Sequence, residues 1–291
     1  MKKKADIGLF ISILSVSAAA ILIRLVSEEV PPLTIAFYRL LFTVLLLLPA
    51  LLFYKKYIGE LLKIDKKTYF LMIGIGVILS LHFAFWITSL DYTSVASSVI
   101  LVTAHPVIVA PVAYYFLKEK VSIVNILGII ISLFGVTILI FGNYDLGALS
   151  VDSLYGNILA IFGGIFAGLY ILGGRKIRKT VSVVPYAFVV YLISTIVLFL
   201  MCIFSNTSIV GIEVRDYEIF ILMAFISGIL GHTIYNWSLK YIKASVASVA
   251  LLGEPVGSTV LAIIILSEIP SSFTFVGGTI ILAGIYLTSR K

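Results

Sequence analysis

The chain has 291 residues, of which 61% are hydrophobic and only 12% are charged, and its net charge is +7. A soluble protein of this length needs far more polar surface to cover its core, so the composition excludes a soluble globular domain. The apolar runs are about 20 residues long and do not alternate, which matches helices crossing a ~30 Å hydrocarbon core rather than the strands of a barrel.

Ten apolar runs predict ten membrane-spanning helices joined by short connections in one compact bundle. In chain order the runs are Ile7–Val26, Thr34–Phe53, Tyr69–Leu90, Val95–Phe116, Ile123–Phe141, Leu154–Gly174, Val183–Phe204, Tyr217–Ser238, Ser245–Leu266 and Phe273–Ser289. The first run follows three lysines and could instead be a signal peptide with a cleavage site near Ala18–Ala20. We expect a true span because the run continues to Val26, and because its removal would leave nine helices.

The distribution of Lys and Arg predicts how these helices are oriented. With the N-terminus inside, 18 of the 21 Lys and Arg residues fall in inside segments, whereas Arg215 alone lies outside and Arg24 and Arg39 lie within spans. Cytoplasmic loops carry such an excess of positive charge, so we expect a cell-membrane protein with both termini in the cytoplasm. The basic excess is then a topology signal, and no nucleic-acid partner is expected.

The second half of the sequence repeats the first at an offset of 149 residues, and we call two residues at this offset repeat partners. The matching pairs include Pro106 and Pro255, Glu119 and Glu268, Gly128 and Gly277, and Gly135 and Gly284. Five helices per copy is an odd number, so the second copy must insert upside down, as in many secondary transporters. We therefore predict an all-α membrane protein of ten transmembrane helices in two inverted five-helix repeats, residues 1–145 and 146–291. A duplication that serves stability alone is the alternative.

Three sequence segments resemble the EamA-type transporters of the drug/metabolite transporter superfamily. They are "LKEKVS…LGIIISLFGV" at Leu117–Val136, "LSEIPS…VGGTIILAGI" at Leu266–Ile285, and "FYRL" at Phe37–Leu40. The resemblance covers essentially the whole chain. It implies ten helices in two inverted repeats, cytoplasmic termini, and the export or exchange of amino acids or related metabolites. The second-half counterpart of Arg39 falls near Tyr191, so the arginine motif is not duplicated.

Glu254 and His105 are the first candidates for a functional site because ionisable groups at mid-membrane cost at least about 2.5 kcal/mol. Each precedes a proline, and a proline within a helix frees the carbonyl four residues back. We expect a carboxyl, an imidazole and free backbone dipoles to meet near the membrane midplane, where they would bind substrate or a coupling proton. Packed kinks in which each side chain bonds a neighbouring helix are the alternative. The helix-break candidates are Pro106, Pro255, Gly253 and Gly257.

Arg39, in the second span, is expected to anchor a substrate carboxylate or phosphate, or to pair with Glu254, unless its side chain extends to the outer headgroups. Aromatic and polar residues near it and in the third and eighth spans would line the same cavity. An interfacial belt of aromatic residues is the alternative for the rings. The remaining substrate-binding candidates are Tyr38, His82, Trp86, Tyr235 and Asn236.

Several chemistries have no motif in this sequence. A Walker-type phosphate loop, an H-E-x-x-H motif and a metal-ligand spacing of the three His residues are all missing, so we expect no cofactor, no metal and no enzymatic activity. The sequence predicts a secondary transporter for a small polar metabolite that works by alternating access, as a monomer or homodimer surrounded by membrane lipids, with protons as a candidate coupling ion. An intramembrane lipid-modifying enzyme and a non-transporting structural protein are the alternatives.

Overall fold

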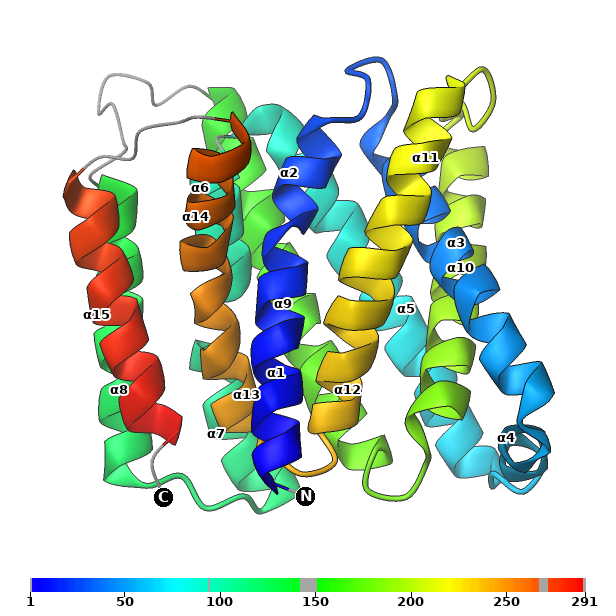
Figure 1. Cartoon of the computed structure of the whole chain (residues 1–291), viewed down its shortest axis with the longest axis horizontal. Coiled ribbons are helices and arrows are strands. Elements are labelled where there is room, and N and C mark those ends of the chain that lie inside the picture. Colours follow the sequence, from blue (N-terminus) through cyan, green and yellow to red (C-terminus); the bar gives the residue numbers. More distant parts are fainter. Residues whose placement is uncertain (1, 94, 142–150, 267–271, 290–291) are drawn as a thin grey trace.

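The computed structural model describes residues 2–93, 95–141, 151–266 and 272–289. Within these ranges the chain is helical and contains no strand. The helices stand side by side in one bundle, and Lys2 and Ser289 lie at the same end of it (Figure 1). We call this the terminal end of the bundle.

The bounds of the elements are as follows. They are α1 (Lys2–Ser17), α2 (Ala19–Arg24), α3 (Pro32–Phe53), α4 (Lys55–Leu61), α5 (Lys66–Tyr92), α6 (Val95–Thr103), α7 (Pro106–Leu117), α8 (Ile123–Phe141), α9 (Val151–Ile177), α10 (Val183–Phe204), α11 (Val214–Met223), the π-helix η1 (Ala224–Thr233), α12 (Ile234–Ser238), α13 (Ala244–Ala250), the 3-10 turn η2 (Leu251–Gly253), α14 (Glu254–Leu266) and α15 (Ser272–Ser289).

Seven helical runs among the described residues are long and apolar enough to cross a membrane. They are Lys3–Arg24, Pro32–Phe53, Lys66–Tyr92, Val151–Ile177, Val183–Phe204, Val214–Ser238 and Ala244–Ile265. Three shorter apolar helices, Leu101–Leu117, Ile123–Ile138 and Phe275–Thr288, coincide with the predicted fourth, fifth and tenth spans. An all-helical, multi-pass membrane fold is therefore confirmed, whereas the count of ten spans stays a prediction.

The fourth and ninth predicted spans are both interrupted at their prolines. In the fourth, α6 ends at Thr103 and α7 begins at Pro106. In the ninth, a 3-10 turn over Leu251–Gly253 separates α13 from α14, which begins at Glu254. Pro106 and Pro255 have no N–H to donate, and their rings crowd the preceding turn, which favours a break or kink in the helix at either position. The two interruptions fall at repeat partners.

α8 and α15 pack against each other along one edge of the bundle (Figure 1). A Cβ added at Gly128 would lie 2.7 Å from the carbonyl oxygen of Gly284, and one added at Gly135 would lie 2.7 Å from that of Gly277. Each glycine thus touches the repeat partner of the other. Ser132 donates to the carbonyl of its own repeat partner, Ile281, at 3.3 Å. A twofold rotation axis between two helices produces this reciprocal pattern, and we call these contacts the glycine seam.

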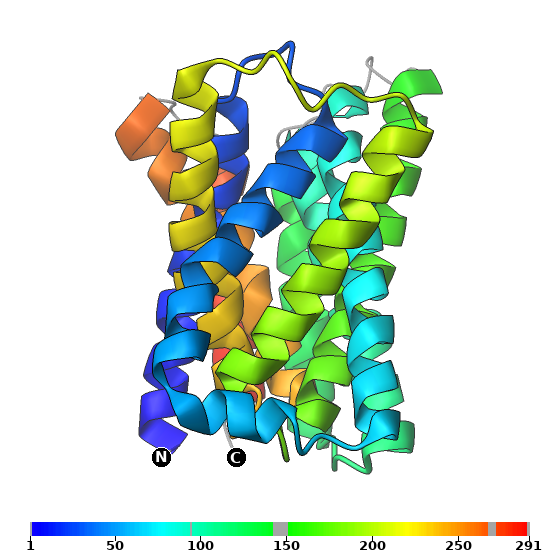
Figure 2. The same cartoon turned by 90° about the vertical axis from the view of Figure 1, so that its right-hand side faces the viewer.

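The sequence analysis did not anticipate the short helix α4, which lies across the terminal end of the bundle between α3 and α5 (Figure 2). All of its residues are at least partly exposed. The Glu60 carboxylate accepts the N–H of Ser182 at 2.5 Å, which ties α4 to the α9–α10 connection. Asp65 then caps the N-terminus of α5 by accepting the N–H of Thr68 at 3.0 Å.

Candidate functional site

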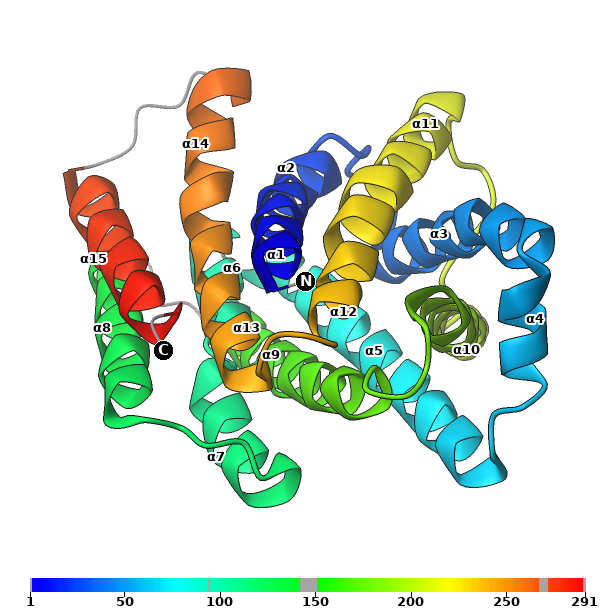
Figure 3. The same cartoon turned by 60° about the horizontal axis from the view of Figure 1, so that its bottom comes forward.

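A cavity lies in the interior of the bundle, where helices of both halves converge. α9, which supplies one wall, lies between α13 and α5 (Figure 3). The lining residues are Val16, Ala19, Arg39, His82, Trp86, Val102, Thr103, His105, Ala167, Tyr170, Ile171, His232, Tyr235, Leu251 and Glu254. Three pairs of repeat partners are among them: Trp86 and Tyr235, Val102 and Leu251, and His105 and Glu254. The cavity is therefore centred where the two halves of the chain face each other.

Six of the eight substrate-binding candidates from the sequence lie on this wall. They are Arg39, His82, Trp86, His105, Tyr235 and Glu254. The helix-break candidates are placed beside it, because Pro106 begins α7 directly after His105 and Pro255 follows Glu254 in the first turn of α14. The structure brings these residues together, and their part in binding stays a prediction.

Arg39 is the least solvated charge on the wall. Only 1% of the residue is exposed, so its side chain does not extend to the headgroups. Its guanidinium carbon lies 4.5 Å from the centre of the Phe83 ring and 5.9 Å from that of Trp86, within the range of cation–π attraction. Neither terminal nitrogen has a hydrogen-bond partner among the described residues, so neither pairs with Glu254. A buried charge in this condition is costly unless an anion completes its hydrogen bonds.

Other buried polar groups of the wall also lack a hydrogen-bond partner. The indole Nε1 of Trp86, the hydroxyl of Tyr235 and Nδ1 of His105 have no hydrogen-bond partner within the described ranges. Buried polar groups normally find partners, so a concentration of unpartnered groups around one cavity points to a ligand or to bound water. Together with Arg39, the indole N–H and the tyrosine hydroxyl form a set of donors suited to a carboxylate or another anion.

His82 has a defined hydrogen bond and orientation. Its Nδ1 lies 2.9 Å from the carbonyl oxygen of Gly163. Because a carbonyl can only accept, Nδ1–H donates this hydrogen bond, and in the neutral ring Nε2 is left as an acceptor. Its ring is nearly parallel to that of Trp86, with centres 5.8 Å apart. The imidazole and indole therefore form one stacked surface on α5, fixed from behind by α9.

The wall at Glu254 is supported by α1. Ser17 donates its hydroxyl to the backbone carbonyl of Glu254 at 3.2 Å, and Ser258 donates to the carbonyl of Ser17 at 2.9 Å. A Cβ added at Gly257 would collide with the Ser17 side chain, so the glycine permits this close approach. A Cβ added at Gly253 would lie 3.3 Å from the Ile13 side chain, which is a tight contact but not a collision. These contacts pack the start of α14 against α1 and hold Glu254 at the cavity.

Two predicted residues, Tyr38 and Asn236, lie outside the lining. The Tyr38 hydroxyl donates to the carbonyl of Ile209 at 2.9 Å, and its ring stacks on Phe220, so it faces the α10–α11 connection. Asn236 lies behind the wall, where its Nδ2 donates to the Tyr170 hydroxyl at 2.5 Å and to the carbonyl of His232 at 2.7 Å. Asn236 therefore positions lining residues rather than facing the cavity.

Among the lining residues that sequence reasoning did not single out are His232 and Tyr170. His232 lies in the π-helix η1, whose wider turns change which side chains face inward, and no simple sequence pattern announces such a turn. The available sequence signal was its repeat partner, Phe83, which lies beside the predicted residue His82. In the structure the two rings of this pair lie 5.4 Å apart. Tyr170 lies in an apolar run of α9, and only its hydroxyl set it apart. Among the described residues, no group of three or more His, Cys, Asp or Glu side chains could hold a metal ion.

Comparison with known proteins gives a consistent result. Residues 3–141 and 154–290 each match the EamA-like transporter family, which confirms the family that the motifs indicated. An uncharacterized transporter of Archaeoglobus fulgidus is 26% identical over 294 residues, covering 100% of this chain and 99% of that protein. The uncharacterized transporter YyaM of Bacillus subtilis is 25% identical over 224 residues, covering 76% of this chain and 72% of its own. A solved crystal structure shares the fold, with a TM-score of 0.79 at 17% identity over 99% of this chain and 97% of that one.

Proposed function

Because the chain belongs to the EamA-like transporter family, we propose that it is a secondary transporter that carries a small polar metabolite across the cell membrane by alternating access. The observation that carries this proposal is the interior cavity with buried, unpartnered donors from both halves of the chain. A purely structural membrane protein would gain nothing from such groups, because each costs free energy when left unpaired.

The substrate class follows from the charges of the wall. Arg39 presents two terminal nitrogens, the geometry that binds a carboxylate through two parallel hydrogen bonds. Glu254 lines the same cavity and would bind an ammonium group or a hydroxyl. One fixed positive and one ionisable acidic group suit a zwitterion, so an amino acid or a related compound is the proposed substrate, moved by export or exchange.

The proposed transport cycle depends on two inverted repeats, residues 1–145 and 146–291, which together make ten spans. The reciprocal contacts of the glycine seam support this architecture, because an axis that relates antiparallel helices lies in the membrane plane. Rocking of the two repeats would expose the cavity to one side at a time. Together with the charge distribution, this architecture supports the proposal that both termini lie in the cytoplasm.

Protons are the proposed coupling ion, and Glu254 is the proposed group that carries them. An ionised carboxylate is costly in a closed, dry intermediate, and either a proton or a cationic substrate group would neutralise it. The empty transporter would then change the side to which its cavity opens only with Glu254 protonated. This scheme requires no ATP and no cofactor.

A counterflow assay tests the proposal. Purified protein is reconstituted into vesicles loaded with a mixture of unlabelled amino acids, and the entry of each labelled amino acid is measured with and without a pH gradient. Entry is expected with the wild-type protein and with Arg24→Gln, which alters an exposed arginine at the end of α2. It is expected to be lost with Arg39→Gln. Equal entry with Arg39→Gln and Arg24→Gln would contradict the proposed site.

A further inference from the structure

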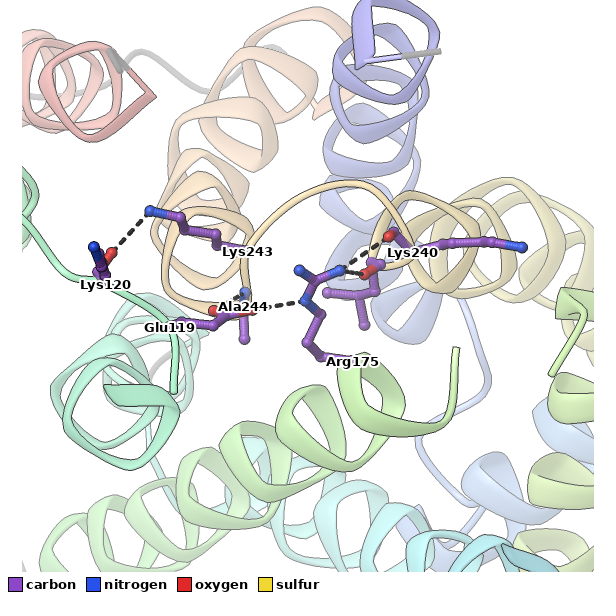
Figure 4. Close-up of polar contacts among 7 residues, drawn as sticks. Glu119, Lys120, Arg175, Lys240, Lys243 and Ala244 are labelled. Atoms are coloured by element: carbon purple, nitrogen blue, oxygen red, sulfur yellow. Dashed lines mark hydrogen bonds and ion pairs between the residues drawn. The ribbon is translucent and has the colours of Figure 1, made fainter. Parts of the chain in front are cut away.

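Glu119 and Arg175 tie three segments together at the terminal end of the bundle (Figure 4). Their side chains form an ion pair, with Nε of Arg175 2.7 Å from Oε1 of Glu119. The second carboxylate oxygen of Glu119 accepts the N–H of Ala244 at 2.9 Å. Nη1 of Arg175 donates to the carbonyls of Leu239 and Lys240 at 2.6 and 3.0 Å. We call these four contacts the inner clamp.

Each charge of the clamp also lies at the helix end that it stabilises. Glu119 accepts the first N–H of α13, where the helix dipole is positive, and Arg175 binds carbonyls that follow α12, where it is negative. The Glu119 residue is only 7% exposed, so water competes little for its hydrogen bonds. Charge-assisted bonds in such surroundings are the strong ones, and here one ion pair holds both ends of the α12–α13 turn.

The backbone before Glu119 directs it toward this turn. Lys118 ends α7 in the left-handed conformation, with φ of 54°, and the N–H of Glu119 then donates to the carbonyl of Ala113 at 3.1 Å. Glu119 therefore belongs to the first half of the chain and is held by that half. Arg175 and Ala244 belong to the second half, so the clamp joins the two halves.

The clamp holds together the ends of helices that line the cavity. Arg175 follows the lining residue Ile171 by four positions, and Leu239 follows Tyr235 by four. Four residues of helix are about 6 Å, so the clamp lies roughly one turn beyond the cavity. Ala247, between the clamp and the cavity on α13, is fully buried. No residue of the clamp lines the cavity itself.

We propose that Glu119 and Arg175 form the gate that closes the transport pathway at the terminal end, and that the contacts of the inner clamp must be released together for the cavity to open there. The proposal rests on the proposed function, since a gate requires a cavity that is reached alternately from two sides. It assigns no substrate contact to either residue. Their effect is on which side of the membrane the cavity faces.

Cysteine labelling tests the gate without any substrate. Val102→Cys places a thiol on the cavity wall, in a Cys202→Ser background that removes the one native cysteine. Membrane vesicles with the terminal end outward, verified by protease removal of a terminal tag, are treated with a membrane-impermeant maleimide. Glu119→Gln or Arg175→Gln is expected to raise the labelling rate about tenfold or more, because bonds to a charged group are lost. The double variant is expected to gain little more, since the two residues act as a unit.

Lys240→Gln is the matched control, because it removes a neighbouring charge while keeping the backbone carbonyl that Arg175 binds. Its labelling rate is expected to stay within about twofold of the parent protein. Labelling from the opposite side of the membrane should fall in the clamp variants, because opening one side closes the other. Labelling that is unchanged at the terminal end, or that rises equally from both sides, would overturn the gate.

A second variant covers the case in which Glu119→Gln is not recovered as folded protein. Glu119→Asp keeps the charge and retracts it by one methylene, and an intermediate labelling rate is expected. A rate equal to that of the parent would overturn the proposal. The labelling also separates the two proposals: shifted labelling in a protein that fails every counterflow assay would leave the gate standing and contradict the transported substrate class.

Discussion

The glycine seam and the cavity are built from the same duplication, yet they have opposite physical character. Along the seam the repeat partners that meet most closely are identical glycines, the helices α8 and α15 are continuous, and Ser132 has a hydrogen-bond partner. Around the cavity the repeat partners differ, as His105 and Glu254 do, the helices are interrupted, and donors lack partners. The identical glycines thus serve close packing, whereas the unlike pair His105 and Glu254 lines the cavity.

Replacing Arg39 by Met should have the largest effect and should separate activity from stability. The variant loses both unpartnered nitrogens, so transport is expected to fall more than about 100-fold. The melting temperature is expected to rise, because removing a buried charge that no protein group pairs relieves its desolvation cost. Counterflow and thermal melts in detergent measure the two effects. A melting temperature that drops sharply would show that Arg39 is a structural residue.

A methyl group added to the seam should have the opposite effect. Gly128→Ala would place a Cβ 2.7 Å from the carbonyl oxygen of Gly284, and this backbone contact cannot be relieved by a rotamer change. A loss of about 1–3 kcal/mol of stability is expected. Gly74→Ala is the control, since no atom lies within 4 Å of its added Cβ, and it should be neutral or stabilising. Similar melting temperatures for the two variants would argue against a tight seam.

Trp86→Phe is expected to weaken substrate binding while leaving stability nearly unchanged. The substitution keeps an aromatic ring beside Arg39 but removes the indole N–H, which has no partner among the described residues. If this N–H serves the substrate, KM should rise about tenfold with little change in the maximal rate, as expected for one lost hydrogen bond. An unchanged KM would remove Trp86 from the substrate-binding set.

Tyr38→Phe should show the reverse, because its hydroxyl bonds to the carbonyl of Ile209 and not to the cavity. Losing this bond is expected to cost about 1 kcal/mol of stability and to leave KM unchanged. Measured beside Trp86→Phe, it distinguishes a lining residue from one in the surrounding structure. A raised KM with normal stability would return Tyr38 to the substrate site.

Asp65→Ala should have the smallest effect, since it alters a solvent-exposed cap far from both regions. The hydrogen bonds from Thr68 lower the pKa of Asp65 in the folded protein. The stabilisation is therefore complete above the ordinary Asp pKa of about 3.9 and is lost as the pH falls through the lower folded-state value. The wild-type protein should melt slightly higher than the variant at neutral pH, and the difference should vanish in acid. A difference that persists in strong acid would contradict the cap.

The sequence predicted the helices best where polar residues mark their ends. α8 and α10 have the bounds expected for the predicted spans, Ile123–Phe141 and Val183–Phe204, and each follows a serine. The helix α4 was not predicted, because it is too short and too polar to resemble a membrane span. The π-helix was not predicted, because its wider turns have no distinct sequence period.

The same distinction applies to the site. Arg39, His105 and Glu254 stood out because ionisable groups are rare and costly in apolar spans. Tyrosines carry no such signal, since a hydroxyl is satisfied wherever packing offers a carbonyl. Tyr38 finds one at Ile209 and turns away from the cavity, whereas Tyr170 meets Asn236 at its edge. Whether a tyrosine faces the cavity depends on its tertiary neighbours, which local sequence patterns do not reveal.

The reciprocity of the glycine seam has a consequence for how this molecule can vary. Two separate copies of a half-length chain, meeting as a symmetric dimer, would form the same contact, but every substitution would then appear on both sides of the axis. Joining the copies in one polypeptide removes that constraint. An asymmetric feature, such as Arg39 without a second arginine at its repeat partner, is then possible within one chain. The seam thus keeps the packing of a symmetric dimer, while the single chain allows the two halves to carry different residues at the cavity.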